Sequence, residues 1–341
     1  MNPGLLEVLR DPESRAPLTL EAAEYDARGG VQSGTLRAAW GRTYPIRDGV
    51  PRFVEPATAL RQSVDSFGDQ WNHFNFVRFH THWLEHTVRN TFGSVEAFRG
   101  KVVVDAGAGS GAQALWMLQS GARHVVLLEL SHAVDGVMRK NLDASGFHNW
   151  DIIQCSIDAP PLRDQSVDLV MCHNVIQHTP SVERTAHALF RLVAPGGEFA
   201  FNCYPRNDEG LARWLRLHLV YEAVRAVLSR CPFRVNLAYA TTMAALRQVP
   251  ALGVLLEKTG LCSQGEVLTA DGAPAGLRQR FQATRLNTFD RFGSHAYQHL
   301  KSNDEIRRLL AALQPDPAKV LNVDKYFSRP APIGCALRVV R

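Results

Sequence analysis

The sequence lacks the features that mark membrane-spanning, exported and zinc-binding chains. It has no window of 18 or more uncharged apolar residues, so we expect no transmembrane helix. No apolar run follows a basic start near Met1, and we expect no signal peptide. The six cysteines include no C-x-x-C pair, which argues against a zinc knuckle and fits reduced thiols in the cytoplasm. Dense lysine and arginine blocks are also absent, so the net charge of +5 does not by itself indicate nucleic-acid binding.

A glycine-rich turn follows the short apolar run Val102–Val104 and is the most informative part of the chain. The run leads into Asp105, and Gly107, Gly109 and Gly111 come next. A continuous apolar run of this kind is typical of a central parallel strand that is covered on both faces. Glycine permits positive φ and a close approach of ligand to backbone, and the helix that follows presents free amides to anionic groups. The pattern predicts a strand, a cofactor-cradling turn and a helix.

Further strands are predicted after this turn. About twenty residues on, the stretch ARHVVLLEL ends at Glu129, a place from which a carboxylate accepts hydrogen bonds from ribose hydroxyls. Two more strands are expected at Asp151–Cys155 and Ser166–Asn174. A helix at Ala186–Leu192 then leads through Ala194–Gly197 into a fifth strand. This alternation predicts an α/β fold with a parallel sheet.

These motifs, in this order, resemble the class I S-adenosylmethionine-dependent methyltransferases, particularly the type 11 group, over roughly residues 60 to 205. The group's D-x-G-x-G-x-G motif matches Asp105–Gly111, and its L-x-P-G-G turn is similar to Ala194–Gly197. A nicotinamide enzyme would share the first strand and the acidic residue, but not the Asp168 strand followed by Ala-Pro-Gly-Gly. The resemblance implies S-adenosylmethionine as cofactor and a Rossmann-like seven-stranded sheet whose last strand is antiparallel.

The resemblance also implies roles for the residues around the loop. Asp105 is expected to orient the methionine end of the cofactor, and Glu129 to hold the ribose, while the three glycines shape the loop. Asn174 is expected to line the cofactor site. The family's adenine-binding aspartate is replaced by Ser156 here. The adenine contact is therefore expected from the Ser156 hydroxyl and the Ile157 backbone amide.

Two further candidates flank this site. In a helical stretch that begins at Ser63, the ring of Trp71 or Phe67 is expected near the positive sulfonium, where an aromatic face contributes about 0.5–2 kcal/mol. Plain packing of these rings onto the sheet is the alternative. His178 follows the fourth strand at the carboxyl edge of the sheet, where ligands bind in such folds. Because imidazole titrates near neutrality, His178 is predicted to be the catalytic base, and fixing of the loop is the alternative.

Four clustered histidines raise the question of a metal site. They are His73, His80, His82 and His86, and only the last two share a helical face. Glu85 lies on a different side of that helix, and no cysteine joins them. We therefore expect solvated or core-edge histidines and predict no metal.

The amino-terminal residues are expected to form a separate β-rich module. Trp40–Val54 resembles the end of a Trm112-like domain, a small relative of the zinc ribbons. At the four positions of the family's cysteine ligands this chain has Asp11, Ser14, Arg37 and Trp40. The resemblance therefore implies the fold without its metal, and a role in packing.

We divide the chain into four segments. Residues 1–56 form the degenerate Trm112-like module, and residues 57–205 the methyltransferase core with its cap helices. Residues 206–300 form a helical lid or substrate insertion, and residues 301–341 the last helix and two strands. Within the insertion, Leu211–Arg230 reads as a basic amphipathic helix, which could rest on a membrane surface or cover the active site. The lid is the preferred interpretation.

Towards the carboxyl terminus, a helix is expected over Ala238–Thr259 despite Pro250, and strands are expected at Val320–Phe327 and Gly334–Val340. Three residues near position 300 are candidates for substrate contact or for ordinary loop packing: His295, Tyr297 and His299.

The predicted function is S-adenosylmethionine-dependent O- or N-methylation of a small-molecule acceptor, of secondary-metabolite, glycan or lipid type. Catalysis then requires chiefly that the acceptor be aligned with the S–CH₃ bond. One alternative is an RNA methyltransferase, against which the lost cysteines and dispersed charge count. The other is a non-catalytic scaffold that activates another methyltransferase, against which the intact glycine loop and Glu129 count. The sequence makes no prediction of oligomeric state.

Overall fold

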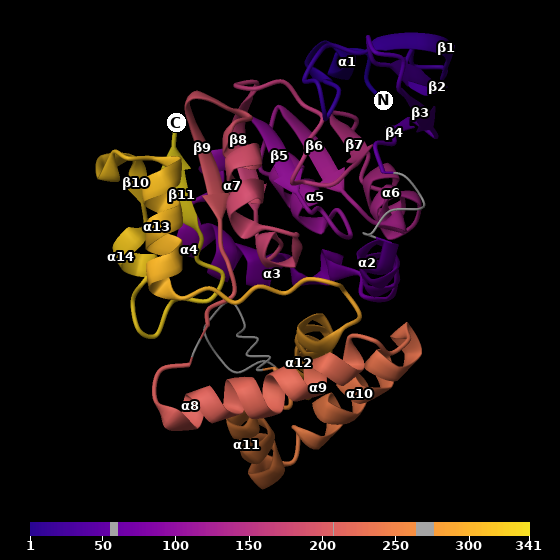
Figure 1. Cartoon of the computed structure of the whole chain (residues 1–341). Helices are drawn as coiled ribbons and strands as arrows, with labels where there is room; N and C mark the ends of the chain where they lie inside the picture. Colours follow the sequence, from indigo (N-terminus) through magenta and orange to yellow (C-terminus); the bar gives the residue numbers. More distant parts are fainter. Residues whose placement is uncertain (55–60, 207, 264–275) are drawn as a thin grey trace.

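The computed structural model describes residues 1–54, 61–206, 208–263 and 276–341. The predicted boundary between residues 56 and 57 lies outside these described residues. Figure 1 shows a central sheet, with a small second sheet near the amino terminus at one end and a layer of helices, α8 to α12, at the opposite end.

The central sheet has seven strands in the order β10-β11-β9-β8-β5-β6-β7. The strands from β7 to β9 pair in parallel, and β11 is antiparallel to both of its neighbours. The predicted α/β class and the antiparallel last strand are thus confirmed. The strands are β5 (Val102–Ala106), β6 (His124–Glu129), β7 (Trp150–Gln154), β8 (Val167–Cys172), β9 (Val193–Phe201), β10 (Val320–Leu321) and β11 (Leu337–Val340).

Helices cover both faces of this sheet, and for that reason its middle strands are mostly apolar. Val103 and Leu127, for example, have no solvent exposure. The helices and helical turns that flank the sheet are η3 (Val95–Phe98), α5 (Ala112–Gln119), η4 (His132–Asp135), α6 (Val137–Asp143), η5 (Ile176–His178), α7 (Val182–Phe190), α13 (Asn303–Leu313), η7 (Pro317–Lys319) and α14 (Val323–Tyr326).

The amino-terminal module is a four-stranded antiparallel sheet in sequence order. Its elements are α1 (Leu5–Val8), β1 (Thr19–Tyr25), β2 (Val31–Arg37), β3 (Thr43–Arg47) and β4 (Val50–Pro51). Leu36 and Ile46 of this sheet belong to the same buried cluster as Ile153 of β7 and Leu162. The module is therefore a separate sheet that shares one core with the central sheet.

The buried carboxylate of Asp11 joins separate segments of that module. It accepts hydrogen bonds from the Ser14 amide (2.9 Å), the Trp40 indole (2.9 Å) and the Tyr44 hydroxyl (2.5 Å). Burial alone would raise the pKa of Asp11, but these donors outweigh it and lower the pKa to about 2. Hydrogen bonds thus join Asp11, Ser14 and Trp40, which are three of the four residues compared above with cysteine ligands.

Two groups of helices lie at the carboxyl edge of the sheet. The cap group is α2 (Arg61–His73), η1 (Phe76–Phe79), α3 (His80–His82), η2 (Trp83–Val88) and α4 (Arg89–Thr91). The insertion comprises α8 (Leu211–Leu215), η6 (Arg216–Tyr221), α9 (Glu222–Leu228), α10 (Phe233–Leu246), α11 (Pro250–Thr259) and α12 (Leu277–Phe292). The two groups meet where Phe74 packs against Leu286 and Phe289 of α12.

Two predictions for the carboxyl-terminal half are wrong. The helix expected over Ala238–Thr259 is two helices, because Pro250 opens α11 after an extended Val249. The strand expected over Val320–Phe327 is two residues long and then turns into α14, because Asn322 takes a left-handed conformation (φ 64°).

Two smaller predictions near the fifth strand are also corrected. The helix expected to begin at Ala186 begins at Val182, where the Ser181 side chain accepts a hydrogen bond from the Arg184 amide. The turn expected at Ala194–Gly197 lies inside β9, which absorbs it through a shift of register against β8.

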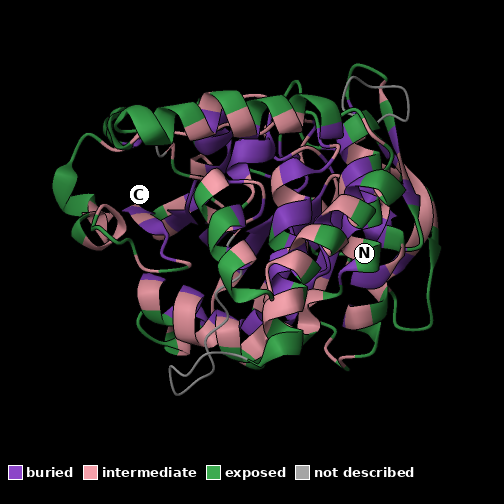
Figure 2. Ribbon diagram, turned by 90° about the horizontal axis from the view of Figure 1, so that it is seen from below, coloured by how far each residue is buried: buried purple, intermediate pink, exposed green. Residues whose placement is uncertain are grey.

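The helical insertion presents apolar side chains to solvent. Leu211 and Leu219 are 74% and 61% exposed, and Figure 2 shows exposed residues along the outward faces of the peripheral helices. Over the part of the chain that the structure describes, every helix is too short or too polar to span a bilayer. Contact of residues 211–230 with a membrane surface stays the untested alternative to a lid.

Candidate cofactor and acceptor site

The loop after β5 has the backbone that the glycine pattern predicts. Gly107, Gly109 and Gly111 have φ of 80°, 55° and 75°. A Cβ atom at Gly107 would lie 2.3 Å from the Val175 side chain, and one at Gly109 would lie 2.7 Å from the ring of Trp71. Glycine is required here both by conformation and by neighbours, and Trp71 of α2 lies directly on the loop.

The two predicted carboxylates are both buried behind this loop. Glu129 accepts hydrogen bonds from the amides of Gly109 and Ser131, each at 2.8 Å, and so holds the loop in shape. Burial and the nearby charge of Glu129 raise the pKa of Asp105 to about 7. One carboxylate oxygen of Asp105, Oδ2, is buried and has no hydrogen-bond partner among the described residues. A buried orphan acceptor of this kind fits a site that receives a hydrogen-bonding ligand.

A pocket of 70 Å³, called here the ribose-side pocket, brings most of the predicted site residues together. It is lined by Ser63, Phe67, Trp71, Gly107, Glu129, Leu130, Ser156, Ile157, Asn174, Val175, His178, Thr179, Pro180 and Asp290. Seven of the ten predicted residues are in this lining. The other three, Asp105, Gly109 and Gly111, shape the loop and the strand end behind it.

A second cavity of 390 Å³, the inner chamber, adjoins the ribose-side pocket. The two share five lining residues: Trp71, Gly107, Asn174, Val175 and Asp290. Tyr204, Gln70 and Leu286 also line the chamber. Together the cavities reach the size of ordinary small-molecule sites, which is roughly 300–1,000 Å³.

Asn174 stands at the junction of the two cavities in a sparsely populated conformation. Its φ is 59°. The backbone amide of Asn174 donates to Oδ1 of Asn202 at 2.6 Å. The side-chain nitrogen of Asn202 donates back to Oδ1 of Asn174 at 2.8 Å. This reciprocal pair joins the carboxyl ends of β8 and β9. Strained backbone that is fixed in this way is typical of functional sites.

Asp290 of α12 is the carboxylate that faces both cavities. It accepts hydrogen bonds from the Tyr204 hydroxyl (2.6 Å) and the Gln70 amide group (3.2 Å), and His178 Nε2 lies 3.7 Å away. Burial by itself would raise the pKa of Asp290, but the hydrogen bond from Tyr204 and the positive charge that His178 carries when it is protonated hold it well below the usual range. Burial and the Asp290 carboxylate in turn raise the pKa of Tyr204.

His178 is buried at the rim of this cluster. Its Nδ1 lies 3.2 Å from the carbonyl oxygen of Tyr297 and so carries the proton in the neutral ring, which directs Nε2 towards Asp290. Its ring also makes edge contacts with Phe67 and His295. Burial lowers the pKa of His295 to about 3. Of the three candidates near position 300, two therefore contact His178: His295 through its ring and Tyr297 through its backbone.

The other histidines do not form a metal centre. The rings of His82 and His86 are 4.4 Å apart, and Glu85 pairs with Arg89 instead of joining them. His73 contacts Arg285. Within the described ranges no group of three or more His, Cys, Asp or Glu residues is placed to hold a metal ion.

Sequence reasoning missed four polar residues of the site: Gln70, Asn202, Tyr204 and Asp290. Asn202 and Tyr204 follow shortly after β9. Their position at the carboxyl end of a strand could have identified them, because ligands bind at that edge of such sheets. Asp290 gave no such signal, because its place depends on how the insertion packs against the sheet.

Comparison with known proteins decides the nature of the core. Residues 104–201 match the Methyltransf_11 family, described as a methyltransferase domain. Over these residues the chain is similar to that family. The predicted enzyme class and the predicted cofactor, S-adenosylmethionine, are thereby confirmed for the domain.

Relatives of the methyltransferase domain include proteins of quinone biosynthesis. A ubiquinone biosynthesis O-methyltransferase of Azoarcus is 34% identical over 109 residues, which is 32% of this chain and 46% of that protein. A ubiquinone/menaquinone biosynthesis C-methyltransferase of Bartonella bacilliformis is 25% identical over 187 residues, 53% of this chain and 67% of that protein. The chain thus spans about half the length of the first curated relatives it matches.

Solved structures are also similar to part of the chain. An S-adenosylmethionine-dependent methyltransferase from Mesorhizobium loti is 23% identical, covers 35% of this chain and 57% of that chain, and gives a TM-score of 0.31.

Proposed function

We propose that the chain is an S-adenosylmethionine-dependent methyltransferase that methylates an oxygen or nitrogen atom of a small-molecule acceptor. The observation that carries this proposal is the junction of the ribose-side pocket and the inner chamber at Trp71, Gly107 and Asn174. A cofactor and an acceptor that enter from the two sides would meet at Asp290. Among the relatives, the ubiquinone biosynthesis O-methyltransferase supports an oxygen acceptor.

The residues around the ribose-side pocket fit the nucleoside end of S-adenosylmethionine. Glu129 lines the place expected for the ribose. The Ser156 hydroxyl donates to Asp158 Oδ1 at 2.5 Å, so its oxygen is left to accept a hydrogen bond from the adenine amino group, beside the Ile157 backbone. The unpartnered oxygen of Asp105 suits the cationic amino group at the methionine end.

Trp71 contributes in two ways. Its ring covers the glycine loop and so excludes water from the backbone that faces the cofactor. Its π face also favours a positive charge at the junction of the two cavities. When bound, S-adenosylmethionine supplies an electrophilic methyl group on its sulfonium.

Asp290 and His178 offer a path for the acceptor's proton. Asp290 faces the inner chamber and can accept a hydrogen bond from an acceptor O–H or N–H group, which aligns the attacking atom. The proton can then pass to His178 Nε2, whose lone pair faces Asp290 and whose Nδ1 proton is held by Tyr297. The resulting imidazolium would be stabilised by the Asp290 carboxylate. The contact of His178 with the Tyr297 carbonyl, which fixes the loop, also sets the ring tautomer that this path requires.

The remaining segments would support this chemistry. We propose that the insertion, residues 206–300, covers the acceptor, because α12 lines the inner chamber. The amino-terminal module, which we compare with Trm112-like domains, would act by packing against β7.

Calorimetric titration of S-adenosylmethionine tests the proposal. Wild-type protein should bind the cofactor, and Asp105→Ala should weaken binding at least about tenfold, or 1.4 kcal/mol. Asp304→Ala, an exposed substitution on α13, is the matched control and should bind like wild type. Absence of binding by wild type would favour the non-catalytic scaffold. Salt-sensitive binding of RNA, followed by methylation of it, would favour the RNA enzyme.

A further inference from the structure

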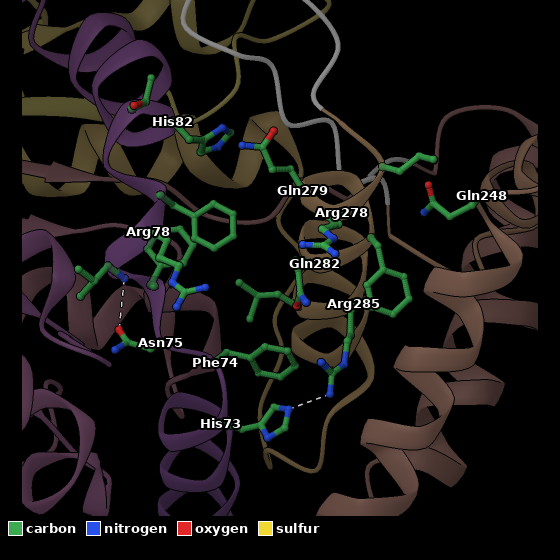
Figure 3. A pocket seen from close by; sticks show the side chains of 17 residues that line it. His73, Phe74, Asn75, Arg78, His82, Gln248, Arg278, Gln279, Gln282 and Arg285 are labelled. Carbon is green, nitrogen blue, oxygen red and sulfur yellow. Dashed lines mark hydrogen bonds between the residues drawn. The ribbon is translucent and has the colours of Figure 1, made fainter.

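A third cavity of 1,240 Å³, the outer groove, opens beside the inner chamber. Figure 3 shows its two walls, with Arg78 on the segment after α2 and Arg278, Gln282 and Arg285 on α12. Its lining is His73, Phe74, Asn75, Phe76, Val77, Arg78, Phe79, Thr81, His82, Gln248, Leu277, Arg278, Gln279, Phe281, Gln282, Arg285 and Leu286. Among the described residues that line it, three are arginines and none is an aspartate or glutamate.

The outer groove and the inner chamber adjoin at a mostly apolar set of shared lining residues, and this place is called here the passage. Phe76, Phe79, His82 and Leu286 line both cavities. Three of these four side chains are hydrocarbon. A ligand that crosses from one cavity to the other therefore needs an apolar section at this point.

Helix α12 runs along the whole route. Arg278, Gln282, Leu286 and Asp290 of this helix are spaced four residues apart, so each lies about one turn beyond the one before it. Arg278 lines the outer groove, Leu286 the passage, and Asp290 the inner chamber. The twelve steps from Arg278 to Asp290 correspond to about 18 Å along the helix axis. A molecule that touches both ends must be elongated.

Arg285 is already oriented in the outer groove. Its Nη2 lies 2.8 Å from His73 Nε2, its Nε donates to the Thr241 hydroxyl at 3.0 Å, and its guanidinium lies over the Phe74 ring. In the described part of the chain no carboxylate pairs with Arg285, Arg78 or Arg278. Arginines without a carboxylate partner, placed at the mouth of an apolar passage, are suited to carboxylate or phosphate groups.

We infer that the methyl acceptor is an elongated anionic amphiphile. Its oxyanion, a carboxylate or phosphate, binds among Arg78, Arg278 and Arg285, its apolar body fills the passage, and its reacting atom reaches Asp290. This inference rests on the proposed methyltransferase function and adds the class of acceptor to it.

Binding of simple amphiphiles to the full chain tests the inference. Dodecyl phosphate, dodecanoate and dodecyltrimethylammonium are titrated below their aggregation concentrations, with tryptophan fluorescence as the readout, because Trp71 and Trp83 line the inner chamber. The two anions should bind at least about tenfold more tightly than the cation of equal chain length, a difference of 1.4 kcal/mol. The tighter of the two anions identifies the oxyanion. Inorganic phosphate alone should bind much more weakly, because it cannot use the passage.

A pair of variants locates the binding. Arg78→Gln combined with Arg278→Gln should weaken dodecyl phosphate binding at least tenfold, while Arg308→Gln, on the exposed side of α13, should leave it unchanged. Thermal melting of each variant checks that it is folded. Equal affinity for anion and cation, or equal affinity of the double variant and wild type, would overturn the inference.

A parallel titration with S-adenosylmethionine separates a failure of the inferred acceptor from a failure of the proposed function. Cofactor binding without preference for anionic amphiphiles keeps the proposed function and overturns the inferred acceptor. Amphiphile binding by a chain that does not bind the cofactor overturns both the acceptor role and the function.

Discussion

The indole nitrogen of Trp40 donates a hydrogen bond to the Asp11 carboxylate at 2.9 Å, at two positions where the resembling Trm112-like domains place cysteines. Ser14, which stands at a third such position, donates from its amide to the same carboxylate. A charged acceptor with several donors can replace a metal because it satisfies buried polar groups from separate segments of a small sheet. The Asp11 carboxylate therefore links separate segments of this module through hydrogen bonds.

Removal of the Asp11 carboxylate should destabilise the whole chain. Asp11→Ala leaves the buried hydroxyl of Tyr44 without its acceptor and removes the partner of the half-exposed Trp40 indole, at a cost of about 2 kcal/mol. Urea unfolding measures the loss. Glu13→Ala, which removes a neighbouring exposed carboxylate, should cost less than about 1 kcal/mol. A chelator should leave the midpoint of wild-type unfolding unchanged, and a chelator-induced drop would contradict a metal-free module.

The same network makes a prediction for acid. The pKa of Asp11 in the folded chain is about 2, below its usual value of 3.8, so the ionised form stabilises the fold. That stabilisation is complete above about pH 4 and is lost as the pH falls towards 2. The difference in unfolding free energy between wild type and Asp11→Asn should therefore shrink over this range. A difference that is constant from pH 6 to pH 2 would show that the charge is unimportant.

The stability that Asp105 contributes changes with pH in the opposite direction to that of Asp11. The folded pKa of Asp105 is raised to about 7, so the protonated form is favoured in the fold, and the stability it contributes is lost as the pH rises from about 4 through 7. Asp105→Asn should accordingly stabilise the cofactor-free protein at pH 8. Because a cationic amino group at the methionine end would favour the ionised carboxylate, cofactor affinity of wild type should rise roughly tenfold from pH 6 to pH 8. Calorimetry across this range checks both signs, and Asp105→Asn should show a flat profile.

Contact between Gly109 and Trp71 can be separated from backbone strain. Gly109 and Gly146 both have positive φ, but only at Gly109 would an added Cβ meet another side chain, the ring of Trp71. Gly146→Ala should cost about 1 kcal/mol of stability without affecting cofactor binding. Gly109→Ala should in addition displace Trp71, shift its fluorescence and weaken S-adenosylmethionine binding at least tenfold. Equal behaviour of the two variants would mean that Trp71 does not cover the cofactor.

Turnover with an identified acceptor tests the proton path. Asp290→Asn should lower kcat roughly 100-fold, because general acid–base groups contribute at least that factor, while S-adenosylmethionine affinity changes little. His178→Gln should lower kcat by a similar factor. Asp65→Asn, an exposed change on α2, serves as the control. An unchanged kcat for His178→Gln would reduce that residue to fixing the loop.

The sequence predicts this molecule best where structure depends on neighbours along the chain. The strand Val102–Ala106 and the glycine turn after it are set by local patterning and backbone freedom, and both are found as predicted. Pro250 and Asn322 mark the failures. Each is also a local signal, since proline favours the first turn of a helix and asparagine tolerates left-handed φ. The apolar runs around these two residues are typical of one continuous helix and one continuous strand, and they led to the wrong predictions.

The parts of the site that could not be predicted depend on tertiary packing. Six of the seven predicted residues that line the ribose-side pocket lie at or after the ends of sheet strands, while the seventh, Trp71, lies on α2. Asp290 reaches the same place from a helix about ninety residues after β9 ends. No periodicity in α12 indicates which of its residues will meet Tyr204. Only the packing of Phe289 against Phe74 and of α12 against the cap helices fixes that position.

The core that Leu36 and Ile46 share with Ile153 also contains Ile157, which lines the ribose-side pocket. The amino-terminal sheet therefore cannot open without loosening the backbone that would hold the adenine. Cooperative unfolding of the two sheets follows from this shared core, and hydrogen exchange in β2 and β3 should slow when a nucleoside ligand binds more than 100 residues away in the sequence. The amino-terminal sheet would thus act as a remote reporter of ligand binding.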